Sequence, residues 1–147
     1  MQGPFERFRL FVNLLESRAR SLAKDYAVEN LAGPQGVSLL YLINHQKEES
    51  YIRDIERRLK VSKSVASGLI KRMEKNGYVT IVPSQKDKRY KQVLLTDLGK
   101  TEGQRFSIFV DAIHDQLFEG ISKSDIRTAL HVLDRLQKNL EKGDQDV

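Results

Sequence analysis

A short polar loop concentrates positive charge around a single carboxylate. In the stretch SQKDKRYKQVLL, residues 84–95, Asp87 is surrounded by Lys86, Lys88, Arg89 and Lys91. Such cations contact nucleic-acid phosphates, and an arginine on a thin loop fits the narrow, electronegative minor groove of DNA. The carboxylate of Asp87 can accept hydrogen bonds from Arg89 or from loop amides and so orient the guanidinium. The loop is therefore a candidate DNA contact, although charges at a hairpin tip also deter edge-to-edge aggregation.

The excess of positive charge is confined to the middle of the chain. Residues 47–91 contain 13 lysines and arginines against six acids, whereas the remainder contains 12 against 14. A localised cationic surface favours a polyanion because binding releases condensed counterions. A solvated basic face without a partner would have the same composition, so the charge needs support from the elements that carry it.

The basic loop lies between two segments of strand composition. YVTIVP and KQVLLT, residues 78–83 and 91–96, are rich in β-branched residues and predict a hairpin. Two short helices are expected before it, over residues 51–59 with Ser50 as N-cap and over residues 63–76 with Ser62 as N-cap. A tight turn at KVS joins them, and two short helices meeting at a tight turn form a helix-turn-helix.

The second of these helices has one apolar face and one face available to DNA. Ala66, Leu69, Ile70 and Met73 form the apolar stripe, and Asn76-Gly77 predicts a left-handed C-terminal stop. The remaining positions are small, polar or cationic, as a helix in a major groove requires. The predicted DNA-binding residues are Ser62, Lys63, Ser64, Ser67, Gly68, Lys71 and Arg72.

Long amphipathic helices are expected at both ends of the chain, over about residues 4–28 and 99–142. Their apolar positions exceed what one small core needs, which predicts self-association. The alternative is that these helices pack on one another within a monomer. The fold class predicted is mainly α with a minor β part: one domain, with residues 34–98 as a winged helix-turn-helix and the terminal helices as dimerisation elements.

The run YIRDIERRLKVSKSVASGLIKRMEKNGYVTIVPSQKDKRYKQVLLTDLGK resembles the winged helix-turn-helix of MarR-type bacterial transcriptional regulators. Asp87 and Arg89 match the D-x-R motif of the family's wing. LTDLGK matches the usual strand end and helix start, and RMEKNGYV matches the recognition-helix exit. With the flanking helices, the resemblance covers nearly the whole chain.

This resemblance implies a homodimer whose wings and recognition helices engage a pseudo-palindromic operator in double-stranded DNA. The expected function is a repressor released by a small-molecule or peptide effector. The family's usual pocket lies between the dimerisation helices and the winged part, where Phe11, Leu15, Tyr41 and His45 are candidates, although each also suits plain core packing. The alternative function is a winged-helix module that binds a protein partner without specific DNA readout.

Other chemistry finds little support in the sequence. The chain has no cysteine, which removes disulfides and thiolate ligands, and no two of its three histidines have an i, i+4 spacing. It has neither a glycine-rich phosphate loop nor a G-x-S-x-G motif. We therefore expect no catalytic site, metal or cofactor. The chain contains no run of about 18 apolar residues, the length that a membrane span requires, so a cytoplasmic location is expected.

Overall fold

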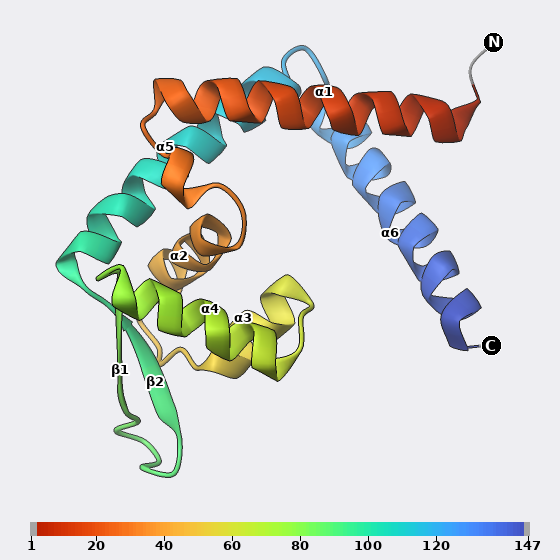
Figure 1. The fold of residues 1–147 in the computed structure, drawn as a ribbon. Helices are drawn as coiled ribbons and strands as arrows, with labels where there is room; N and C mark the ends of the chain where they lie inside the picture. Colours follow the sequence, from red (N-terminus) through yellow and green to blue (C-terminus); the bar gives the residue numbers. More distant parts are fainter. Residues whose placement is uncertain (1–2, 146–147) are drawn as a thin grey trace. The chain divides into compact units, whose positions relative to one another are not determined.

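The structure of the protein is a computed structural model that describes residues 3–145 (Figure 1). The chain divides into two compact units, residues 1–113 and residues 114–147. The described part is mainly helical with one two-stranded wing, as the sequence predicts. The elements are α1 (Pro4–Asp25), the 3₁₀ helix η1 (Glu29–Leu31), α2 (Pro34–Asn44), α3 (Ile52–Leu59), α4 (Lys63–Lys75), β1 (Val79–Pro83), β2 (Lys91–Leu95), α5 (Asp97–Leu117) and α6 (Lys123–Gln145).

The core of the first unit lies among α2, α3 and α4. Leu39, Ile55, Ile70 and Met73 are fully buried there, and each comes from the apolar face of its helix. Because α3 and α4 bury one face each against this core, their opposite faces and the turn between them lie at the surface. The hairpin of β1 and β2 extends away from these helices (Figure 1).

The first helix ends earlier than the predicted Val28. The amide of Tyr26 bonds to the carbonyl oxygen of Leu22, and Ala27 then adopts a positive φ of 55°, which stops helical propagation. Val28 and Leu31 are fully buried, so the chain leaves the helix in order to place these two side chains in the core. The sequence pattern shows their apolar character but not the change of direction.

The predicted N-cap at Ser50 is wrong. The cap of α3 is Tyr51, whose backbone N–H donates to the Asp54 carboxylate at 2.8 Å. Ser50 instead accepts a hydrogen bond at its carbonyl oxygen from the Val93 amide at 2.7 Å, and Tyr51 pairs with Gln92. The residues before α3 therefore form a short bridge to the wing, and this ties the wing to the helix-turn-helix.

The boundaries of α4 follow the predicted signals, and α5 and α6 also begin at capping hydroxyls. The Ser62 hydroxyl accepts the Val65 amide at 3.2 Å at the start of α4, and Gly77, with φ of 84°, ends that helix. At the start of α5, the Thr96 hydroxyl accepts the Gly99 amide at 3.0 Å. Ser122 likewise accepts the Asp125 amide before α6.

Both units leave apolar side chains at the surface. In α1 the exposed apolar residues are Phe5, Phe8, Leu10, Phe11, Val12 and Leu14. In the second unit, α6 buries none of its described side chains and exposes Leu130, Val132, Leu133, Leu136 and Leu140. Within residues 3–145, no helix combines the length and the apolar character that crossing a bilayer requires.

Candidate nucleic-acid interface

The helix-turn-helix is built from α3, a three-residue turn and α4. Lys60 adopts a left-handed conformation with φ of 53°, which reverses the chain after α3. The amide of Val61 bonds to the Glu56 carbonyl oxygen, and Ser62 then caps α4. A turn fixed at both sides holds the N-terminus of α4 at the surface, where its first amides and side chains can approach a polyanion.

The predicted DNA-binding face of α4 is accessible along its length. Ala66, Leu69, Ile70 and Met73 are buried, as predicted. The predicted contact residues lie on the other side: Ser62, Lys63, Ser64, Lys71 and Arg72 are exposed, and Ser67 and Gly68 are half-buried.

Sequence reasoning missed one residue on this face. Val65 is 54% exposed in the first turn of α4, between the predicted contacts Ser64 and Ser67. An apolar side chain at such a position suits contact with a thymine methyl group in the major groove. In the sequence, Val65 is an apolar residue outside the apolar stripe of this helix, and this could have indicated its exposure.

The wing is a regular antiparallel hairpin with a polar tip. Its register pairs Val79 with Leu95 and Pro83 with Lys91, so residues 84–90 form the loop. Within this loop, the Ser84 amide bonds to the Tyr90 carbonyl oxygen at 2.9 Å and the Tyr90 amide to the Asp87 carbonyl oxygen at 3.0 Å. These bonds give the tip one conformation and place Lys86, Lys88, Arg89 and Lys91 at the surface.

The predicted hydrogen bonds between Asp87 and Arg89 are present. The Nε of Arg89 donates to Asp87 Oδ1 at 3.0 Å, a terminal guanidinium nitrogen donates to Oδ2 at 2.7 Å, and the Arg89 amide donates to Oδ1 at 3.1 Å. The guanidinium holds the pKa of Asp87 below its ordinary value, with a smaller effect from the Arg89 amide, and the carboxylate raises the pKa of Arg89. The Arg89 side chain is nevertheless 84% exposed, so it is oriented and also accessible.

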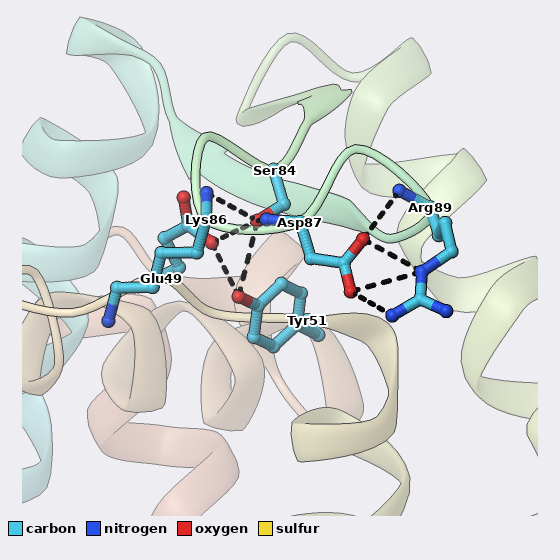
Figure 2. A network of polar contacts seen from close by, with 6 residues as sticks. All are labelled: Glu49, Tyr51, Ser84, Lys86, Asp87 and Arg89. Atoms are coloured by element: carbon cyan, nitrogen blue, oxygen red, sulfur yellow. Dashed lines mark hydrogen bonds and ion pairs between the residues drawn. The ribbon is translucent and has the colours of Figure 1, made fainter.

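A second set of polar contacts fixes the wing to the chain segment before α3. The Glu49 carboxylate accepts hydrogen bonds from the hydroxyls of Ser84 and Tyr51 and, at 2.8 Å, from the Gln85 amide. Ser84 is 1% exposed, and its hydroxyl oxygen accepts the amides of Lys86 and Asp87 at 3.1 Å each. Figure 2 shows this chain of contacts from Glu49 through Ser84 to the loop that carries Asp87 and Arg89.

Hydrogen bonds from Ser84 and Tyr51 lower the pKa of Glu49 from 4.5 to about 2. The residue is therefore ionised at neutral pH, and a carboxylate with several donors makes stronger hydrogen bonds than a neutral acceptor. No role was assigned to Glu49 from the sequence. A contact across 35 residues leaves no periodic signal in the sequence.

Comparison with known proteins agrees with this geometry. A model of the MarR family matches residues 33–89, from the start of α2 into the wing loop. The heme-free crystal structure of PefR is 47% identical, with a TM-score of 0.80, over 93% of this chain and 99% of that one. The chain belongs to the MarR family.

Two further comparisons extend this result. The transcription regulator MarR from Oenococcus oeni PSU-1 is 25% identical, with a TM-score of 0.75, over 89% of this chain and 96% of that one. The transcriptional activatory protein BadR of Rhodopseudomonas palustris is 30% identical over 94 residues, which are 63% of this chain and 54% of BadR. The match thus spans about half the length of that curated relative. MarR proteins are transcriptional regulators and not enzymes.

The four residues that the sequence suggests for an effector pocket lie in two places, Phe11 and Leu15 on α1 and Tyr41 and His45 at the end of α2. The ring of Tyr41, on α2, stacks on that of His45, the C-cap of this helix, with ring centroids 4.0 Å apart, and a His45 ring nitrogen lies 2.7 Å from the Tyr41 carbonyl oxygen. Phe11 and Leu15 lie on α1, where Phe11 is 48% exposed. His45 also lines a cavity of about 290 Å³ that reaches Val93 and Lys100, at the junction of α2, β2 and α5.

Proposed function

We propose that the protein is a dimeric repressor that binds a pseudo-palindromic operator in its own or a neighbouring promoter and acts in the cytoplasm. The observation that carries the proposal is the pairing of an accessible α4 N-terminus with a wing whose Arg89 is both oriented and exposed. A recognition helix reads base edges in the major groove, and a thin wing with an arginine suits the neighbouring minor groove. Lys63, Ser64, Ser67 and Lys71 would read bases or clamp phosphates. Lys86, Lys88 and Lys91 would add backbone contacts.

The proposed dimer is supported by the exposed apolar side chains of α1 and α6. Rows of exposed Phe, Leu and Val on long helices are unusual for a monomer and typical of an interface. A two-fold dimer presents two identical helix-turn-helix units, and this symmetry is what a pseudo-palindromic operator requires. We propose that the terminal helices, about residues 4–28 and 99–142, form this interface.

An effector would release the operator by binding more tightly to a form of the dimer whose α4 helices are wrongly spaced. We infer that heme is the first effector to test. PefR from Streptococcus agalactiae is a heme sensor protein whose crystal structure contains heme, and it is 47% identical over 95% of this chain. Bound heme would supply an iron centre that takes protein ligands, and histidine is a common one.

The histidines of the chain are suitable ligands for heme iron. Of its three histidines, His45 has one ring nitrogen against the Tyr41 carbonyl oxygen, which leaves the other for a metal. His114 packs edge-on against Phe118 at 4.7 Å, with Asp115 nearby at 3.9 Å. His131 is exposed on α6. Titration with hemin should give a shifted Soret band that one of the variants His45→Ala, His114→Ala or His131→Ala abolishes. An unchanged spectrum in all three would overturn histidine ligation.

A gel-shift titration on the DNA upstream of the protein's own gene tests the proposed function. Binding should be retained at moderate salt and fall steeply as salt rises, because phosphate contacts release counterions. If no shift occurs even at low salt, the alternative applies: a winged-helix module that binds a protein partner. A promoter–reporter assay gives the sign of regulation, which matters because BadR is named as an activatory protein.

A further inference from the structure

A cleft separates the wing from the helix-turn-helix on the surface proposed to face DNA. It has a volume of about 500 Å³ and is lined by the start of α3, the first turns of α4 and the wing. Four of its lining residues are cations, Arg53, Lys63, Arg89 and Lys91, against a single carboxylate, Glu56. A concave site with this charge balance favours an anion over a neutral ligand. Arg53 was not among the residues predicted from the sequence to contact DNA.

Two tyrosine rings hold the guanidinium of Arg53 in this cleft. Its central carbon lies 4.9 Å from the ring centroid of Tyr51 and 5.3 Å from that of Tyr90. The two rings meet edge to face at 6.3 Å. A guanidinium that lies over an aromatic ring keeps its N–H edge available to an acceptor, and this arrangement lowers the entropy lost when it binds a planar or tetrahedral anion.

The ring of Tyr51 and the backbone of Tyr90 are held by the contacts that hold the wing. The Tyr51 hydroxyl donates to Glu49, and the Tyr90 amide donates to the Asp87 carbonyl oxygen at 3.0 Å. One ring thus comes from the helix-turn-helix side and the other from the wing. Arg53 lies where the two parts meet, and its position depends on both.

We propose that this cleft binds one phosphate group of the DNA backbone, with Arg53 as its principal ligand. The inference rests on the proposed function. If α4 lies in a major groove and the wing in the adjacent minor groove, the sugar–phosphate strand that separates the two grooves must pass between them. The cleft occupies that position, and its cations come from both sides of it. A guanidinium offers two parallel N–H donors to phosphate oxygens, which a lysine cannot do.

The test compares two arginines of the same helix. Arg57 is exposed on α3 and lies outside the cleft lining, so Arg57→Gln removes the same charge without touching the site. Arg53→Gln should weaken binding to the upstream fragment roughly tenfold or more, as for loss of a hydrogen bond to a charged group. It should also reduce the slope of log affinity against log salt concentration by about one. Arg57→Gln should leave both the affinity and this slope near their wild-type values.

A second variant separates orientation from charge. Arg53→Lys keeps the charge and loses the planar donor pair, so we expect weakened binding with an unchanged salt slope. Failure of the wild-type protein to bind any DNA would sink the proposed function itself. Wild-type binding together with equal affinities for Arg53→Gln and Arg57→Gln would overturn the cleft as a phosphate site. Full affinity in Arg53→Lys would overturn the role given to the paired donors of the guanidinium.

Discussion

Glu49 accepts a hydrogen bond from the hydroxyl of Ser84 across 35 residues of sequence. The bond joins the segment before α3 to the first residue of the wing loop. Ser84 in turn bonds the amides of Lys86 and Asp87, so the orientation of Arg89 depends on a carboxylate outside the wing. The wing is therefore held at its base by Glu49 and at its tip by Asp87.

Replacing Glu49 by Gln should loosen the wing, because the variant loses the charge that strengthens these hydrogen bonds. We expect faster hydrogen exchange at the amides of residues 85–87 and weaker operator binding. Glu48→Gln, an equal charge change at the exposed neighbouring residue, is the matched control. Exchange rates at residues 85–87 that match between the two variants would show that the Glu49 contacts do not hold the wing.

The stabilising effect of Glu49 should depend on pH. Because the folded protein holds the pKa of Glu49 at about 2, below its ordinary value of 4.5, the contacts stabilise the fold fully above pH 4.5 and are lost as the pH falls towards 2. The difference in melting temperature between wild type and Glu49→Gln should be largest near neutral pH and shrink across this window. A difference that stays constant from pH 7 to pH 2 would be incompatible with an ionised Glu49 in these contacts.

Gly68 offers a test of close approach to DNA. Apart from the adjacent turns of its own helix, no atom of the protein lies within 4 Å of where a Cβ at this position would be, so no neighbouring element requires glycine there. Gly68→Ala should raise the free energy of unfolding by about 1 kcal/mol, since glycine disfavours a helix interior. If the DNA backbone comes close to this face, the same variant should bind the operator more weakly. Higher stability combined with unchanged affinity would show that no such approach occurs.

The dimer can be tested on α6. Leu133 is 49% exposed, and in a two-fold interface each substitution counts twice. Leu133→Lys should therefore weaken dimerisation by about 3 kcal/mol or more, the scale expected for two buried leucines. Sedimentation equilibrium measures this directly, with Lys138→Ala on the same helix as the control. Equal dimer stability in both variants would exclude Leu133 from the interface.

Substitution of Lys86 should weaken DNA binding without changing sequence specificity, if the wing binds DNA. Lys86→Ala should lower affinity for all sequences alike and reduce the salt slope by about one, because a lysine at this position is expected to contact phosphate alone. Competition with unrelated DNA at several salt concentrations separates this behaviour from loss of specificity. A sequence-dependent loss in Lys86→Ala would place that residue in base readout instead.

Local signals in the sequence were enough to predict several local structural features of the candidate site. The cap at Ser62, the glycine stop at Gly77 and the pairing of Asp87 with Arg89 each depend on residues within three positions of one another. The errors arose where distant segments meet. Ser50 was assigned to a helix cap because its bond to Val93 cannot be inferred from neighbouring residues.

The two most informative omissions have the same origin. Glu49 lies in a segment of ordinary loop composition, and Arg53 lies on a helix with several other cations. Their significance comes from Ser84 and Tyr90, which reach them only once the hairpin folds back towards α3. Without tertiary contacts, neither residue differs from a solvated surface charge.

The central claim is that Arg89, oriented by Asp87 on the wing, contacts the operator. The most direct measurement is the affinity of Arg89→Ala for the upstream DNA fragment, beside wild type and with melting temperature and dimerisation as controls. Because the side chain is exposed, folding and self-association should not change, while binding should weaken by about 1–3 kcal/mol, or roughly fivefold to 150-fold. Wild-type affinity in a folded, dimeric Arg89→Ala protein would contradict the claim.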